Sequence, residues 1–190
     1  MRVAFYAPLK PPDSPIPSGD RKMARQLIAC LRSKGYDVKL ISHLKSREPH
    51  GLRHKQIIIK NRSERIVERL SNRFLEVDGW RPDVWFTYHM FYKAPDWLGP
   101  SISKALKIPY VIAEASHAPK RNKGNWSFNQ EQVVLALKHA DLIIGLNSND
   151  ECCVKQVISS NCTYEFIKPF VGPNAPPSCG NNRAFFREEI

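Results

Sequence analysis

No apolar run in the sequence is long enough to cross a membrane, since a spanning helix needs about 20 consecutive apolar residues. The first residues, MRVAFYAPLK, turn polar after about seven positions, which is too short for the apolar region of a signal peptide. We therefore expect a cytoplasmic protein that can also bind peripherally at the inner membrane surface.

Metal-binding and disulfide patterns are missing as well. The five cysteines include the adjacent Cys152 and Cys153 but no CxxC spacing, and the six histidines do not fall at ligand spacing from a cysteine pair. An odd cysteine count without an export signal favours reduced thiols over a disulfide framework. The sequence thus predicts neither a metal site nor a disulfide scaffold.

Two catalytic signatures are also absent. The loop after the first apolar run carries only Gly19 in place of the GxGxxG fingerprint, which disfavours a nicotinamide or flavin enzyme. The GxSxG nucleophile elbow does not occur, which disfavours a serine esterase.

The composition that remains is that of one globular domain with a strong positive charge. The chain has 190 residues, 42% hydrophobic and 25% charged, and a formal net charge of +11. This charge points to an anionic partner: a phosphorylated substrate, an anionic membrane or nucleic acid. Nucleic acid is disfavoured because no recognisable nucleic-acid-binding motif accompanies the charge.

Apolar runs alternate with helical patterns along most of the chain. Strands are predicted at residues 2–8, 36–42, 56–60, 83–88, 110–115, 141–146 and 164–171. Helices are predicted between them, including one that opens at residues 18–20 and one over residues 63–77. The alternation predicts a single α/β domain with a doubly wound, mostly parallel, Rossmann-like sheet.

Polar and aromatic side chains gather where two predicted strands end. The first group is Tyr88, His89, Tyr92 and Lys93, and the second is Glu114, His117, Lys120 and Arg121. Parallel strands deliver their carboxyl ends to one edge of a sheet, so we expect both groups to border one ligand crevice. Because Glu114 is the only acid in these two groups, hydrolysis by paired carboxylates is disfavoured.

Several of these positions have a structural explanation beside the functional one. Tyr88 suits either the core or an acceptor cleft, and a lone histidine such as His117 is often structural. Gly19 can admit a ligand oxyanion to a helix N-terminus, or can simply follow a capping Ser18. Asp20 suits a sugar hydroxyl better than a phosphate. The remaining residues expected to bind substrate are Arg21 and Asn147.

Residues 43–73 carry nine lysines and arginines against three glutamates, a local charge of 9 − 3 = +6. Arg65, Arg69 and Arg73 recur every four residues, and like charges at that spacing each cost an isolated helix about 0.2–0.5 kcal/mol. Phospholipid headgroups or a polyanionic acceptor would relieve this repulsion. The alternative is a solvated face on which Glu68 and Glu76 pair with neighbouring arginines.

Three blocks of sequence resemble a known family. They are the opening RVAFYAP, the segment PSGDRKMARQLIACLRSKGYDVKLIS, and PDVWFTYHMFYKAPDWLGPSISKALKIPYVIAEASHAPKR. They resemble the N-terminal, acceptor-side domain of retaining GT-B bacterial glycosyltransferases of the group 1/family 4 type. HADLIIGLNSND and FIKPFV are similar to later segments of that domain, so the resemblance covers residues 1–171.

The resemblance implies a sugar-transferring enzyme whose active site lies between two Rossmann-like halves. The N-terminal half would bind a glycolipid or polysaccharide acceptor. The other half would bind a nucleotide-diphosphate sugar as donor substrate, with no tightly bound cofactor. By position, Gly19, Lys120 and Arg121 would lie near the donor diphosphate, and His117 with Glu114 near the reacting sugar. Asp20 stands where the family often has a second glycine.

The resemblance also implies a domain division. Residues 1–171 would form the N-terminal domain, and residues 172–190 the interdomain linker and the start of a donor-binding domain. The family's paired-glutamate donor motif does not occur in this sequence, so we expect activity to need a C-terminal donor-binding domain or subunit. The alternative is a non-catalytic module that binds a glycan or an anionic lipid.

Overall fold

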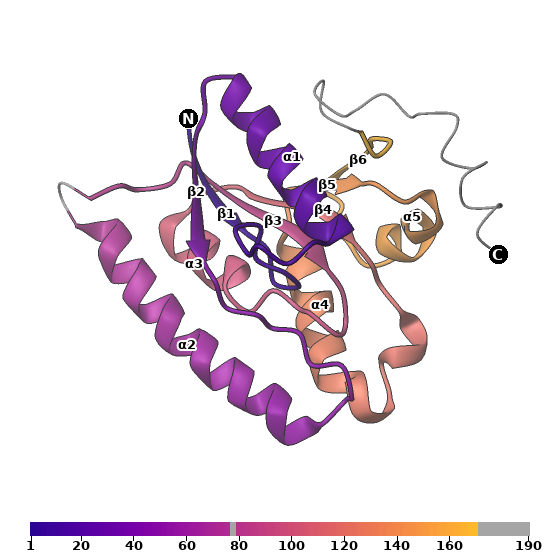
Figure 1. The fold of residues 1–190 in the computed structure, drawn as a ribbon. Coiled ribbons are helices and arrows are strands. Elements are labelled where there is room, and N and C mark those ends of the chain that lie inside the picture. Colours follow the sequence, from indigo (N-terminus) through magenta and orange to yellow (C-terminus); the bar gives the residue numbers. More distant parts are fainter. Residues whose placement is uncertain (77–78, 171–190) are drawn as a thin grey trace, which may run out of the picture.

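A six-stranded parallel sheet in the order β2-β1-β3-β4-β5-β6 forms the centre of the computed structural model, which describes residues 1–76 and 79–170 (Figure 1). The strands are β1 (Arg2–Tyr6), β2 (Asp37–Ser42), β3 (Val84–Met90), β4 (Tyr110–Ala115), β5 (Leu142–Gly145) and β6 (Thr163–Phe166). The α-helices are α1 (Gly19–Ser33), α2 (Arg53–Leu75), α3 (Gly99–Leu106), α4 (Ser127–His139) and α5 (Ser148–Lys155), and two short 3-10 helices are η1 (Pro119–Arg121) and η2 (Gly124–Trp126). The predicted α/β fold with a parallel, Rossmann-like sheet is confirmed.

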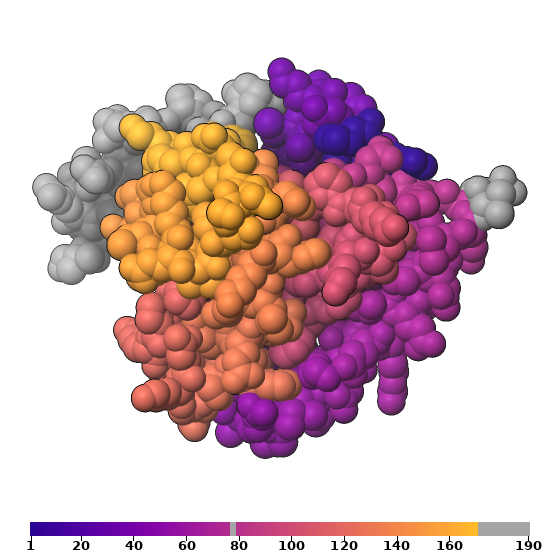
Figure 2. Space-filling view, turned by 180° about the vertical axis from the view of Figure 1, so that it is seen from behind, coloured from indigo at the N-terminus to yellow at the C-terminus, as the bar shows by residue number. Residues whose placement is uncertain are grey.

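Helices cover both faces of the sheet. On one face α1 packs Ala24 and Leu27 against the apolar side chains of β1 and β3, and we call this the α1 face. On the other face α2, α3 and α4 contribute Phe74, Ile102 and Leu137 to a larger core. Seen from behind, the orange segments of the chain fill the middle of the molecule beside the magenta α2 (Figure 2). None of the described helices has the length and apolarity that crossing a bilayer requires.

The strand order reverses direction at β1, because β2 pairs with one of its edges and β3 with the other. At such a switch point the connections from neighbouring strands leave in opposite directions, and a crevice opens at the carboxyl ends of the strands. The loops that follow β1, β3, β4 and β5 all start at this edge, so the fold itself places them together.

The predicted strand at residues 56–60 is wrong, because this segment lies inside α2. Burial of Gln56, Ser63, Leu70 and Phe74 follows the helical period, with Gln56 fully buried. Ile57 and Ile58 are 39% and 48% exposed, so the run of three isoleucines that suggested a strand lies mostly outside the core. The helix predicted over residues 63–77 therefore begins ten residues earlier, at Arg53.

A buried carboxylate starts this longer helix. Glu48 is 2% exposed, and its side chain accepts hydrogen bonds from the backbone N–H groups of His50, Gly51 and Leu52. Gly51 has a φ of 75°, a left-handed conformation that suits glycine. The turn formed by residues 48–52 directs the chain into the first turn of α2.

A second buried carboxylate, Asp96, fixes the connection from β3 to α3. Its Oδ1 accepts from the N–H groups of Leu98 and Gly99, each at 2.8 Å. Its Oδ2 accepts from the Thr87 hydroxyl at 2.5 Å and from the Tyr110 hydroxyl at 2.8 Å. Burial and the charge of Asp96 raise the pKa of Tyr110, so this hydroxyl stays protonated and keeps donating. The loop after β3 is thereby tied to β3, β4 and α3.

The final strand, predicted over residues 164–171, begins at Thr163 and ends at Phe166, so its start is within one residue of the prediction but residues 167–170 lie outside the strand. The predicted linker at residues 172–190 lies outside the described residues.

Gly99→Ala tests the Asp96 network. A Cβ at Gly99 would come within 2.3 Å of Asp96 Oδ2 and 2.7 Å of Trp85 Nε1, so the substitution must displace buried polar groups. We expect a loss of about 1–3 kcal/mol in the free energy of unfolding, measured by urea denaturation. Gly19→Ala is the control, because a Cβ there meets nothing within 4 Å. Equal stability of the two variants would contradict this account of the network.

Candidate functional site

A pocket of about 630 Å³ lies at the carboxyl edge of the sheet. Four segments contribute its walls: the first loop with the start of α1, the ends of β3 and β4, the start of α5, and the end of β6. The lining residues are Lys10, Ser18, Gly19, Asp20, Met23, Tyr88, Glu114, Leu146, Asn147, Ser148, Phe166 and Pro169. Five residues predicted from the sequence, Gly19, Asp20, Tyr88, Glu114 and Asn147, are therefore brought together here.

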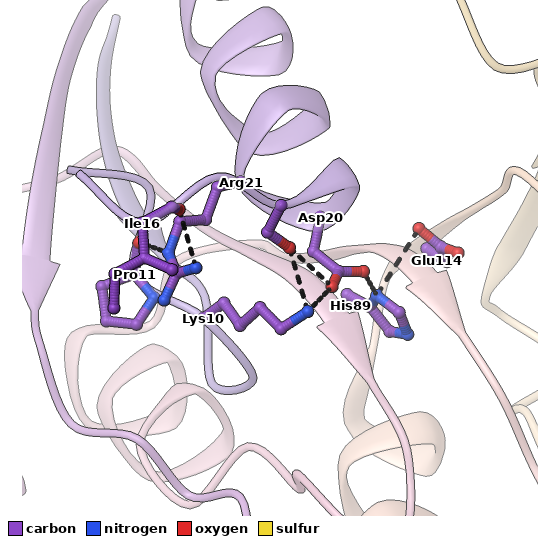
Figure 3. A network of polar contacts seen from close by, with 8 residues as sticks. Lys10, Pro11, Ile16, Asp20, Arg21, His89 and Glu114 are labelled. Carbon is purple, nitrogen blue, oxygen red and sulfur yellow. Dashed lines mark hydrogen bonds and ion pairs between the residues drawn. The ribbon is translucent and has the colours of Figure 1, made fainter. Parts of the chain in front are cut away.

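The proline-rich loop after β1 is held in place by Arg21. This side chain is buried, and its guanidinium donates to the carbonyl oxygens of Pro11, at 3.2 Å, and Ile16, at 3.0 Å. Figure 3 shows these bonds directed into the loop, away from the side where Asp20 and His89 lie. Arg21, predicted to bind substrate, does not line the pocket, and its observed contacts position the loop that does.

This loop brings Lys10 to the start of α1. The Lys10 ammonium donates to the Asp20 carboxylate and, at 2.9 Å, to the Ser18 hydroxyl. Burial acts to raise the pKa of Asp20, but the hydrogen bond from Lys10 and the charges of His89 and Lys10 outweigh it and lower the pKa. Asp20 is therefore anionic at neutral pH, in the first turn of α1, where the helix dipole also favours negative charge.

His89 and Glu114 have an unusual backbone conformation. Each has a φ of 59°, in the left-handed region that bulky residues avoid. The two residues lie opposite each other in adjacent strands, between the pairs Tyr88–Ala113 and Met90–Ala115. Such a conformation costs on the order of 1–3 kcal/mol per residue and persists where the surrounding structure enforces it, often at functional sites.

The left-handed conformations of His89 and Glu114 change the face of the sheet on which the next side chain of each strand lies. Side chains two apart in a regular strand share a face, yet Tyr88 packs on the α1 face and Met90 in the opposite core. Ala113 and Ala115 divide in the same way. His89 consequently reaches the start of α1, where its Nδ1 lies 3.0 Å from Asp20 Oδ1 and 3.9 Å from Glu114 Oε2 (Figure 3).

Tyr88 belongs to both the core and the pocket. It is 3% exposed and packs with the apolar residues of the α1 face, and it also lines the pocket. Burial, followed by the charge of Glu114 and a hydrogen bond with it, raises the pKa of Tyr88 well above its ordinary value. The hydroxyl therefore remains protonated and donates to Glu114.

The loops after β3 and β4 meet beside this pocket in a second cluster of aromatic and cationic side chains. The Arg121 guanidinium lies 5.1 Å from the centre of the Tyr92 ring, which packs edge-on against Trp126 at 5.2 Å. Lys93 Nζ lies 5.6 Å from the centre of the Trp126 ring. Lys120 is exposed on η1. Tyr92, Lys93, Lys120 and Arg121 thus lie on converging loops, as expected, but they do not line the pocket itself.

His117 occupies a different environment from His89. It is 7% exposed, and its Nδ1 lies 3.1 Å from the carbonyl oxygen of Cys153 in α5, so Nδ1 carries the proton. Its Nε2 is buried and has no hydrogen-bond partner in the described part of the chain. His117 does not line the pocket. Its hydrogen bond to Cys153 connects the loop after β4 to α5. A role near the reacting sugar stays a prediction.

Asn147 forms the cap of α5. Its Oδ1 accepts from the N–H of Asn149 at 3.1 Å, and its Nδ2 donates to Asp150 at 2.9 Å. Because the cap also faces the pocket, ligand contact and helix capping compete for the same amide.

The sequence analysis identified neither Lys10 nor Asp96 as important residues. Lys10 follows a strand by several residues, and only the fold of the proline-rich loop brings it to Asp20. Residues 1–76 and 79–170 contain no group of three or more His, Cys, Asp or Glu side chains placed to hold a metal ion. No protein-family model matches the chain, and no curated protein matches it.

Asp20→Asn tests the ionised carboxylate. Since folding lowers the pKa of Asp20 below its ordinary 3.8, its ionised contacts stabilise the fold above that pH and are lost as pH falls through the lower value. We expect the variant to be less stable than the parent at pH 7, with the difference shrinking towards acid. Urea denaturation at a series of pH values measures this, with Glu131→Gln at an exposed position of α4 as control. A difference that is constant with pH would contradict the assignment.

Proposed function

We propose that this chain is the acceptor-binding half of a glycosyltransferase. It would act with a C-terminal donor-binding domain or subunit to move a sugar from a nucleotide-diphosphate donor to a glycolipid or polysaccharide. The observation that carries the proposal is the pocket at the carboxyl edge, lined by Asp20, Glu114 and Asn147 together with aromatic rings. Carboxylates and amides bind sugar hydroxyls, and rings pack against the apolar face of a sugar.

The neighbouring cluster supports the same proposal. Sugar transfer releases a diphosphate, and cations aimed at the developing negative charge normally supply the largest stabilisation. Lys93, Lys120 and Arg121 lie on the two loops beside the pocket, where a second domain closing over the edge would bring the donor. Arginine can bind a diphosphate with two parallel hydrogen bonds. Acceptor and leaving group would then occupy adjacent parts of one cleft.

The test is a reconstitution assay. The purified chain is incubated with UDP- and GDP-sugars and with lipid and polysaccharide extracts, alone or with a separately produced donor-binding domain. We expect labelled sugar to be transferred only when both parts are present, and Asn147→Ala to reduce that transfer at least severalfold. Turnover by the chain alone at about 1 per second, an ordinary enzyme rate, would contradict the half-site assignment. Absence of both transfer and saccharide binding would reject the function.

A second candidate function is binding of anionic lipid, and the corrected extent of α2 favours it. The helix has 23 residues, about 34 Å in length. Five of its exposed cations form a stripe at helical spacing, with Ile58 between the first two: Lys55, Arg62, Arg65, Arg69 and Arg73. No ion pair among residues 1–76 and 79–170 involves Arg65, Arg69 or Arg73, so the pairs with Glu68 and Glu76 that the spacing allows are not formed there.

Charge reversal on α2 tests lipid binding. The triple variant Arg65→Glu, Arg69→Glu, Arg73→Glu should lose most binding to phosphatidylglycerol vesicles in a sedimentation assay, because each cation near an anionic surface contributes about 1 kcal/mol. The control changes Lys104, Lys107 and Lys138 to Glu, which alters net charge equally at exposed positions of α3, its C-terminal end and α4. Equal binding of the two triple variants to vesicles would rule out lipid binding through α2. Binding of the parent chain to RNA but not to vesicles would favour a nucleic-acid partner instead.

A further inference from the structure

The two pocket carboxylates differ in their surroundings. Asp20 is bonded to Lys10, Ser18 and His89. Within the described chain, Glu114 has the Tyr88 hydroxyl as its hydrogen-bond partner, and its nearest nitrogen is His89 Nδ1 at 3.9 Å. A carboxylate has about four acceptor positions, so most of those on Glu114 remain available. Glu114 is the pocket's open hydrogen-bond acceptor.

The charge of the pocket lining is opposite in sign to the net charge of the protein. The chain as a whole is strongly basic, yet the described residues of the pocket lining include one cation, Lys10, and two carboxylates, Asp20 and Glu114. Lys10 is already paired with Asp20. A phosphate placed against Glu114 would meet an anion with no free cation in the lining, whereas a hydroxyl would donate a charge-assisted hydrogen bond.

The strained backbone is what places Glu114 in the pocket. Ile112 lies in the core covered by α2, α3 and α4, so regular alternation would put the side chain two residues later on that buried face. The left-handed conformation at Glu114, matched by His89 in the next strand, instead turns the carboxylate towards His89 and Tyr88. The fold thus maintains strain at two facing positions while presenting an incompletely paired carboxylate to a pocket.

We propose that Glu114 selects the ligand of this pocket, accepting hydrogen bonds from adjacent hydroxyl groups of an uncharged polyol and excluding a phosphate from the same position. The apolar side chains of Met23, Leu146 and Phe166 cover the C–H face of the bound ring. His89 positions the carboxylates through its contacts with Asp20 and Glu114. This inference rests on the proposed function and specifies which part of the acceptor enters the pocket.

The experiment compares neutral and phosphorylated sugars. The full 190-residue chain, labelled with ¹⁵N, is titrated by NMR with glucose, galactose and mannose, and with the 6-phosphate of each. We expect at least one neutral hexose to shift the amide signals of Gly19, Glu114 and Asn147 with about millimolar affinity. Its 6-phosphate should bind at least severalfold more weakly.

The variant Glu114→Gln tests whether Glu114 selects the ligand, with a separate check that the protein still folds. Glutamine keeps the size but loses the charge, so we expect neutral-hexose binding to weaken by roughly tenfold, as for a lost hydrogen bond to a charged group, and discrimination against the phosphate to shrink. The matched control is Glu131→Gln on α4, which should leave both affinities unchanged. Thermal unfolding of both variants checks that the fold is retained. Should Glu114→Gln fail to fold, Tyr88→Phe, which removes only the hydroxyl bonded to Glu114, is expected to alter the same ratio of affinities.

The outcomes distinguish this inference from the function on which it rests. Binding of the sugar phosphate as tightly as the neutral sugar, or an unchanged ratio in Glu114→Gln, would overturn the selection by Glu114 and leave the acceptor role standing. Failure of every saccharide to bind would overturn both. A preference for the neutral sugar that Glu114→Gln removes would establish the inference.

Discussion

Asp96 holds together the parts of the molecule that carry the candidate site. Its buried carboxylate is stable only while its hydrogen-bond donors remain in place, because a buried charge that loses its partners is strongly destabilising. Those donors belong to β3, β4 and the start of α3. The network therefore fixes β3 and β4 relative to each other through the middle of β3 and the start of β4, and His89 and Glu114 follow Thr87 and Tyr110 by a few residues in the same strands.

The same framework separates charges of opposite sign. The pocket opens on the α1 face and at the strand ends, where Asp20 and Glu114 dominate its lining. A row of exposed cations lies on α2, which packs against the other face of the sheet. Among the described residues, the cavity lining thus carries more carboxylates than cations, while cations lie on α2 and on the loops beside the pocket. Attraction of an anionic surface and recognition of an uncharged ligand can then operate independently.

The sequence predicted strands and helices correctly in segments where the apolar residues of the pattern are also the buried residues of the structure. The prediction for residues 56–60 was wrong because three consecutive isoleucines are typical of a strand. The buried residues that show the helical period, Gln56 and Ser63, are polar and do not stand out in the sequence. Several site residues were predictable because polar groups after parallel strands must meet at one edge. The left-handed conformations of His89 and Glu114 were not, since neither is glycine and the alternation of strand residues gives no sign of the switch.

Those two positions also bear on any effort to make the protein more robust. Screens for thermal stability favour substitutions that relieve backbone strain, and glycine or asparagine relieves it at a left-handed residue. Such a screen would select against the histidine at 89 and the carboxylate at 114. A variant selected for thermal stability could therefore keep its sheet, its helices and its pocket. It would lose the imidazole of His89 and the carboxylate of Glu114, which supply polar groups in and beside the pocket.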